Sequence, residues 1–162
     1  WVNLPKAFKM TAPRYQTLLS SEIPAVDIGE GAGRLRVIAG EFRGVTGPAK
    51  TFSPVHLYDL HLAAGHRIEL DLPEGFNSSL FVLHGQVLVN GSQTVGEVEI
   101  GLFGQRGERV VLEAKQDATM LVLSGEPIAE PVARYGPFVM NTRDEIIQAV
   151  QDYQAGKMGH LS

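Results

Sequence analysis

The chain has 162 residues, 44% of them hydrophobic and 20% charged, with a formal net charge of −4, values typical of a globular domain with one sizeable core. It contains no cysteine, which excludes disulfides, zinc–thiolate sites and thiol nucleophiles and fits a reducing compartment, so the predicted localisation is cytoplasmic. The scattered Lys and Arg residues form no basic stripe for nucleic acid, and no uncharged apolar stretch is long enough to cross a membrane.

Residues 1–33 form the first segment and show little hydrophobic periodicity. Prolines and glycines interrupt them repeatedly, a pattern that predicts an extended arm or linker. The chain begins with the strand-like stub Trp1 to Pro5, with no initiator methionine, turn or helix cap before it. We therefore expect a fragment of a longer protein, with an arm that comes from a missing first domain.

From Arg34 onward, the sequence changes to short apolar and β-branched runs that are separated by Gly and Pro turns. Asn90-Gly91 supplies the two positions with φ above zero that a type I′ hairpin needs. Regular strand spacing without intervening helices predicts an antiparallel β-barrel or β-sandwich over residues 34–125. The runs cover residues 34–39, 56–64, 66–72, 79–90, 93–103, 108–114 and 118–124.

The last segment, residues 126–162, contains one predicted helix at about residues 142–155. Thr142 and Glu145 have the spacing of a capping box at its start, and Gly156 is placed to end it. Apolar residues recur at helical spacing and predict one buried helix face. These residues are Ile146, Ala149, Val150 and Tyr153.

Four segments carry a family resemblance: Trp1 to Pro5 (WVNLP), Met10 to Gln16 (MTAPRYQ), Gly125 to Val132 (GEPIAEPV) and Tyr135 to Thr142 (YGPFVMNT). In matching order, they resemble the second half of a pirin family protein. The resemblance implies two cupin barrels in one polypeptide, with one iron-type centre in the first barrel and a metal-free second barrel packed on it. For this chain it implies an all-β fold, an antiparallel, jelly-roll-like cupin barrel with an extended N-terminal arm and one C-terminal α-helix.

The resemblance also implies the cupin metal-ligand pattern of three histidines and one glutamate, which can be aligned with this sequence. Asp71 and Pro73 then stand at the first two histidine positions, Ser78 at the glutamate position and Gly107 at the last histidine position. Only one of these four residue types binds metal readily. We therefore expect no metal in this chain and iron or another divalent metal in the missing N-terminal domain.

The five histidines are not expected to form a replacement site. His56, His61 and His66 are five residues apart, and side chains at that spacing on one strand point to opposite faces. His84 is expected at a strand bend and His160 in a polar tail. A structural or solvent-exposed role is the favoured interpretation for each.

Asp59 and His61 are two residues apart and share one face of a predicted strand. A carboxylate in this position can orient an imidazole as a general base. The favoured alternative is a polar pair at the surface or the barrel mouth.

Glu97 and Glu99 also share a predicted strand face, and paired carboxylates can perform acid–base chemistry. Val98 and Ile100 on the opposite face are expected in the core. The two glutamates are therefore interpreted as residues on the solvent-exposed face of an amphipathic strand.

Three function classes remain open, and no catalytic or cofactor-binding residue is assigned. The first is a structural and interaction domain that packs on the N-terminal cupin domain of its parent. The second is a quercetin 2,3-dioxygenase-like enzyme whose chemistry belongs to the full-length parent, and the third is a regulatory binder of a transcription factor or metabolic enzyme. Apolar surface that lacks its partner tends to self-associate, so a homodimer or arm exchange is also predicted.

Overall fold

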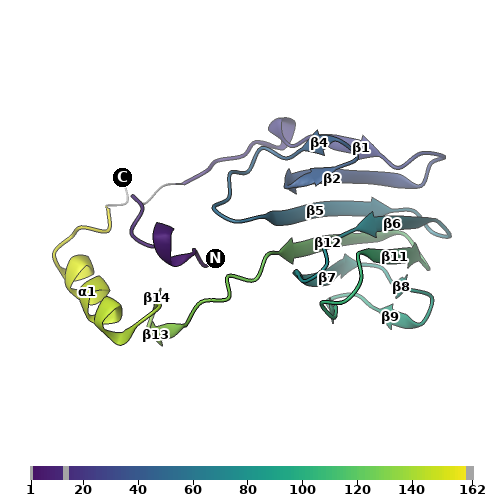
Figure 1. Cartoon of the computed structure of the whole chain (residues 1–162). Helices are drawn as coiled ribbons and strands as arrows, with labels where there is room; N and C mark the ends of the chain where they lie inside the picture. Colours follow the sequence, from purple (N-terminus) through teal and green to yellow (C-terminus); the bar gives the residue numbers. More distant parts are fainter. Residues whose placement is uncertain (1, 13–14, 160–162) are drawn as a thin grey trace. The chain divides into compact units, whose positions relative to one another are not determined.

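A computed structural model describes residues 2–12 and 15–159 of the chain. The chain forms two compact units. The barrel unit comprises Leu18–Pro127, and the terminal unit combines both chain ends, Trp1–Thr17 and Ile128–Ser162 (Figure 1). Within the described residues, no helix has the length and hydrophobicity needed to cross a membrane.

The barrel unit is built from two antiparallel sheets and a short hairpin of β3 (Glu41–Phe42) and β4 (Val45–Thr46). The six-stranded sheet has the order β1 (Ala25–Asp27), β2 (Gly33–Ala39), β5 (Val55–Leu62), β12 (Ala118–Gly125), β7 (Asn77–His84) and β10 (Ile100–Leu102). The four-stranded sheet has the order β6 (Arg67–Asp71), β11 (Arg109–Ala114), β8 (Val87–Val89) and β9 (Gln93–Val95).

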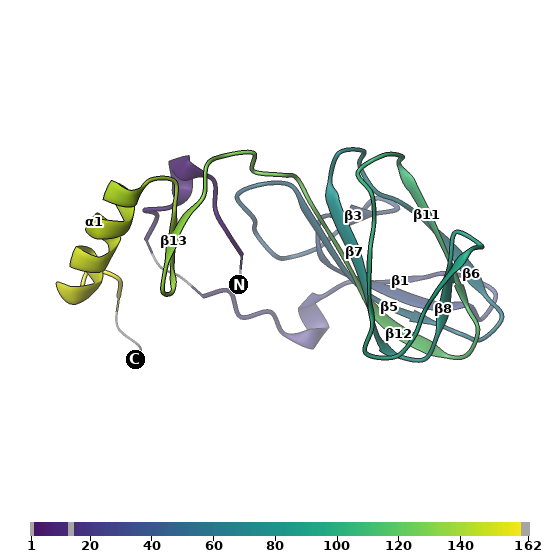
Figure 2. The ribbon, with the colours of Figure 1, turned by 90° about the horizontal axis from the view of Figure 1, so that it is seen from below.

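Both sheets contribute to a single apolar core. Figure 2 shows the strands of the barrel unit from below. On β5, alternate residues Tyr58, Leu60 and Leu62 are buried, while Asp59 and His61 face outward and are partly exposed. The period-two pattern therefore sorts apolar side chains inward and polar side chains outward. The prediction of an antiparallel β-fold with one C-terminal helix is confirmed.

Two predicted strands are each divided by a turn, so their predicted lengths were wrong. Residues 79–90 are split at Gly85, which has φ +87°, into β7 and β8 of different sheets. A Cβ at Gly85 would lie 2.3 Å from the carbonyl oxygen of Asp117, so only glycine fits. Residues 93–103 are split into β9 and β10 by a turn in which Val98 has φ +62°.

The predicted hairpin at Asn90-Gly91 is confirmed. Asn90 and Gly91 have φ of +49° and +68°, and the Ser92 N–H donates to the Val89 carbonyl at 3.1 Å. The turn joins β8 to β9, which pair antiparallel. A type I′ turn matches the right-handed twist of the two strands.

The terminal unit consists of a short 3-10 helix (Lys6–Phe8), a hairpin of β13 (Ala133–Tyr135) and β14 (Phe138–Met140), and α1 (Arg143–Gln154). The capping box is confirmed, because Thr142 Oγ1 accepts from the Glu145 N–H at 3.2 Å and Glu145 Oε2 accepts from the Thr142 N–H at 2.9 Å. Gly156, with φ +71°, follows the helix as predicted.

The buried face of α1 is smaller than predicted. Ile146 and Ala149 are buried with Met140, whereas Val150 is half-buried and Tyr153 is 64% exposed. The apolar face that the periodicity predicts is therefore larger than the part of α1 that the terminal unit buries.

The structure groups the chain differently from the predicted arm (1–33), barrel (34–125) and extension (126–162). β1 and a 3-10 helix at Ser20–Glu22 both fall inside the predicted arm, and residues 18–33 belong to the barrel unit. The domain boundaries remain a prediction.

Candidate functional site

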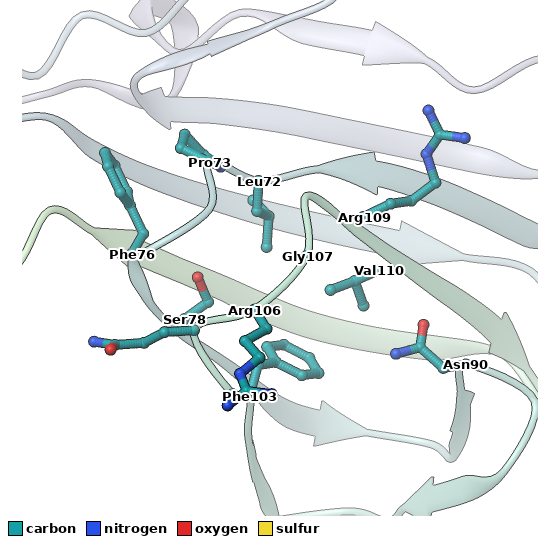
Figure 3. A pocket seen from close by; sticks show the side chains of 12 residues that line it. Leu72, Pro73, Phe76, Ser78, Asn90, Phe103, Arg106, Gly107, Arg109 and Val110 are labelled. Atoms are coloured by element: carbon teal, nitrogen blue, oxygen red, sulfur yellow. The ribbon is translucent and has the colours of Figure 1, made fainter.

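Three of the four residues at cupin ligand positions line one small cavity at the end of the barrel unit. Pro73, Ser78 and Gly107 come from the β6–β7 loop, the start of β7 and the β10–β11 loop, and they surround about 110 Å³ (Figure 3). Asp71 lies outside the lining, where its carboxylate accepts from Arg109 Nε at 2.9 Å.

One side of this cavity is apolar. Leu72 and Val110 belong to the barrel core, and the half-buried rings of Phe76 and Phe103 complete the apolar part of the lining. Ser78 Oγ lies 2.8 Å from Oγ of the buried Ser124, so the two hydroxyl groups form a hydrogen bond with each other. This side of the cavity favours contact with an apolar group over a hydrated ion.

The polar side of the cavity comes from the loop before β11. Gln105 Nε2 donates to Asn77 Oδ1 at 2.8 Å, and the Gly107 N–H donates to Glu74 Oε1 at 3.2 Å. Arg106 also lines the cavity, and Figure 3 shows its side chain beside Phe103. These loop hydrogen bonds position the Arg106 backbone at the cavity rim.

The four ligand-position residues do not fit a cupin metal centre. Pro73 and Gly107 carry no ligating side-chain atom, and the Asp71 carboxylate is engaged by Arg109. In the described part of the chain, no three His, Asp or Glu residues are grouped so that they could hold a metal ion. We derive no metal chemistry for this chain, and its metal-free state remains a prediction.

His56 has a structural environment inside the barrel unit. Its Nδ1 lies 2.7 Å from Tyr58 Oη, which donates to the Glu41 carbonyl at 2.6 Å. Desolvation lowers the pKa of His56, although the Glu41 charge opposes this. Burial, aided by Glu41, raises the pKa of Tyr58 to about 12. The neutral His56–Tyr58 pair ties β5 to the β3–β4 hairpin.

Asp59 and His61 do come together on the outer face of the six-stranded sheet. Asp59 Oδ1 lies 3.3 Å from His61 Nε2, and Asp59 Oδ2 accepts from Arg36 at 3.1 Å. His61 Nδ1 is 3.3 Å from Thr119 Oγ1. Sequence reasoning missed Arg36 and Thr119, because their place beside His61 and Asp59 depends on the pairing of β2, β5 and β12.

His61 and Thr119 also help to line a cavity of about 280 Å³, together with His84 and Asp117. The Asp59 carboxylate serves Arg36 as well as the imidazole. A carboxylate that also binds an arginine orients the imidazole less strongly as a general base. The interpretation of Asp59 and His61 as a polar surface pair therefore still accounts for the contacts.

The predicted Glu97–Glu99 strand pair is wrong, because these residues lie in the turn before β10. Glu97 Oε2 is 2.8 Å from His84 Nδ1, whereas Glu99 Oε2 accepts from the Gly96 N–H at 2.7 Å. Val98 and Ile100 are 72% and 59% exposed, so their predicted core position is also wrong. The turn at Val98 ends the alternation on which the prediction depended.

The remaining histidines have separate surroundings, apart from the cavity that His84 shares with His61. His66 is half-buried, with Nδ1 3.2 Å from the Ala64 carbonyl, and His84 stands before the bend at Gly85 as expected. His160 lies outside the described residues.

The terminal unit carries a feature that sequence reasoning missed. A groove of about 800 Å³ runs between β13 and α1, and Tyr135, Ile146, Ile147 and Val150 contribute its apolar lining. Exposed Ile147 and Tyr135 lie outside the helix face that the periodicity singled out. Ile147 was the available signal, because it is the one apolar residue of α1 outside the predicted helix face.

Comparisons with known proteins give a consistent result. Residues 57–159 match the family described as the pirin C-terminal cupin domain. The chain is 48% identical over 157 residues to a putative quercetin 2,3-dioxygenase of Pseudomonas aeruginosa, with 97% of this chain and 54% of that protein covered. It is 35% identical to pirin-like protein 2 of Arabidopsis thaliana, with 98% and 51% covered.

A solved structure confirms the predicted fold class. The crystal structure of a quercetin 2,3-dioxygenase from Acinetobacter baumannii superposes with a TM-score of 0.92 at 40% identity, covering all of this chain and 56% of that one. The chain thus spans about half the length of the relatives that it matches.

Proposed function

The chain belongs to the pirin C-terminal cupin domain family, and from this premise we propose that it is a metal-free structural half. In this proposal it packs on an N-terminal, metal-binding cupin domain of the same polypeptide. The relatives support this arrangement, because they extend well beyond the part that the chain matches. The terminal unit is the proposed contact.

One observation carries the proposal: among its described residues, the terminal unit exposes more large apolar side chains than it buries. Its core consists of Met140, Ile146 and Ala149, which is too little to stabilise a separate domain. Large apolar residues of both chain ends remain exposed, and such surfaces mark sites of protein contact. They are Val2, Phe8, Met10, Tyr15, Val132, Tyr135, Ile147 and Tyr153.

Hydrogen bonds join the two chain ends into one surface. Glu130 Oε2 accepts from the Lys6 N–H at 2.7 Å and from Asn141 Nδ2 at 3.0 Å. Lys6 Nζ lies 3.6 Å from Glu145 Oε1. The arm and the segment around α1 therefore present their apolar side chains together.

The groove between β13 and α1 is the proposed centre of the contact. Its volume of about 800 Å³ accommodates several side chains of a partner, and apolar grooves beside a helix are common docking sites. Arg134, Arg143 and Asp144 form part of its lining, which gives it a polar rim. An apolar centre with a polar rim is the usual anatomy of a specific interface.

Sedimentation velocity of the chain mixed with the separately produced N-terminal half of its parent tests this proposal. We expect a one-to-one complex, and we expect Ile147→Asp to weaken it about tenfold or more, since it places a charge in a desolvated contact. Leu102→Asp is the control, because Leu102 is an exposed apolar residue of the barrel unit, at 77% against 57% for Ile147.

The proposal fails if the two halves do not associate, or if Leu102→Asp weakens the complex as much as Ile147→Asp. Without the N-terminal half, the same surface is expected to associate with a second copy of the chain. Ile147→Asp should then shift the chain alone toward the monomer.

A second candidate function is quercetin 2,3-dioxygenase activity of the full-length parent. It is favoured by the similarity to proteins that carry this name, and in it the present chain contributes only structure. Quercetin turnover with added iron should appear in the parent and not in this chain. Turnover by this chain alone would contradict the assignment of the chemistry to the other half.

A further inference from the structure

We propose that the cavity lined by Pro73, Ser78 and Gly107 binds a small aromatic carboxylate. The cavity occupies the place where the cupin pattern expects metal ligands, yet the residues at those positions leave a small space with an apolar side and a polar side instead. Its size, its walls and its charge each point to this ligand class. The inference does not depend on the proposed packing of the terminal unit.

The volume of the cavity sets the size of the ligand. Its volume is about 110 Å³, and an engineered apolar cavity of about 150 Å³ is known to bind benzene. Because the present cavity is smaller, a single six-membered ring enters it only in part, with its substituent directed toward the opening. Fused or linked ring systems are too large to be enclosed.

The walls favour a flat, apolar ring. Leu72 and Val110 are buried core residues, and Phe103 packs against the same core. Phe76 supplies a second aromatic wall. Aromatic rings prefer offset or edge-to-face contact with other rings, so two phenylalanines at one cavity select a ring over an aliphatic chain.

The charge of the lining favours an anion. Arg106 and Arg109 both line the cavity, and no Asp or Glu does so among the described lining residues. Arg109 is already engaged, with Nε 2.9 Å from Asp71 Oδ1 and NH1 3.5 Å from Glu69 Oε2. Arg106 makes no ion pair with any carboxylate in the described ranges 2–12 and 15–159. Its guanidinium is the available partner for a carboxylate, which it can bind through two parallel hydrogen bonds.

Asn90 adds a second donor at the cavity. Its Oδ1 accepts from the Val111 N–H at 2.9 Å, which orients the amide and leaves the Nδ2 group to donate. A donor opposite Arg106 suits a ring that carries an oxygen substituent as well as its carboxylate. The lining thus combines an apolar slot with donors at its rim.

A titration of the full chain with benzoate, followed by amide NMR, tests the proposal. Saturable shifts are expected at the cavity backbone, including Gly104, Arg106 and Gly107, with a dissociation constant in the millimolar range. Benzamide has the same shape without the charge and should bind about tenfold more weakly, because a charge-assisted bond is replaced by a neutral one. Acetate, which lacks the ring, should also bind weakly.

Two variants separate the site from general anion binding. Arg106→Gln should weaken benzoate binding about tenfold, and its spectrum reports directly that the barrel is still folded. Arg67→Gln is the control, because Arg67 is also an exposed arginine of the barrel unit but does not line the cavity. The proposal is overturned if benzoate produces no saturable shifts, if benzamide binds equally well, or if the two variants behave alike.

Discussion

The two units of the chain differ in how completely they bury their own apolar residues. The core cluster of the barrel unit contains twenty buried apolar residues from both sheets, whereas that of the terminal unit contains three. Buried polar groups differ in the same direction. Ser124 pairs with Ser78 in the barrel unit, but Asn141 Oδ1 is buried with no hydrogen-bond partner in the described residues. A complete core indicates a unit that folds by itself, and an incomplete one indicates a unit that needs a partner.

The largest expected effect comes from core deletions that compare the two units. Leu60→Ala removes a fully buried core side chain of β5, the strand that pairs with β2 and β12, and should cost about 3 to 5 kcal/mol of unfolding free energy. Ile146→Ala should leave the main urea transition unchanged, because the terminal unit contributes little to it. Equal shifts of that transition in both variants would show that the units unfold as one.

The bend at Gly85 gives the next largest effect. Gly85→Ala places a methyl group against the Asp117 carbonyl at a position with φ +87°, and should cost about 3 kcal/mol in urea unfolding. Gly91→Ala is the control, because its φ is also positive but nothing lies near the added methyl group. It should cost only about 1 kcal/mol, and a control as costly as Gly85→Ala would refute the steric explanation.

A smaller effect is expected at the cap of α1. Thr142→Ala removes the acceptor for the Glu145 N–H and should destabilise the helix by about 1 kcal/mol. Hydrogen exchange that is faster than in the wild-type chain, and only at the α1 amides, is the measurement, and Thr142→Ser should restore the wild-type rate. Unchanged exchange in α1 would mean that the cap does not limit the stability of the terminal unit.

The smallest expected effect is on how the unfolding free energy of the barrel unit depends on pH. Desolvation lowers the pKa of folded His56 below its ordinary value of 6.5, so the unfolded chain binds the proton more tightly. The stabilising contribution is therefore complete above about pH 6.5 and is lost as the pH falls through the folded pKa. His56→Gln should flatten this part of the pH–stability curve measured by urea unfolding. An identical slope in wild type and variant would contradict a titrating His56.

Local signals in the sequence predicted the parts of the fold that depend on neighbours in the chain. The Asn90-Gly91 hairpin and the Thr142–Glu145 capping box are fixed by residues within a few positions. The Val98 turn was missed, because a β-branched residue is rarely found at positive φ. The alternating pattern around it instead resembled a continuous strand.

The sequence predicted which residues lie together at the candidate site, but not which charged side chain is available there. Laying the ligand pattern on the sequence brought Pro73, Ser78 and Gly107 together, and all three line one cavity. The role of Arg106 was missed, because it depends on the ion pairs that engage Arg109. Such pairing arises from strand register, which the sequence pattern does not reveal.

Hydrogen exchange of the α1 amides, measured with and without the N-terminal half of the parent, tests the central claim most directly. The account predicts fast exchange across Arg143–Gln154 in the chain alone and slower exchange in the complex, while the core strands of the barrel unit are protected in both. Exchange in α1 that is already as slow as in β5 and β12, and that the N-terminal half does not change, would contradict it.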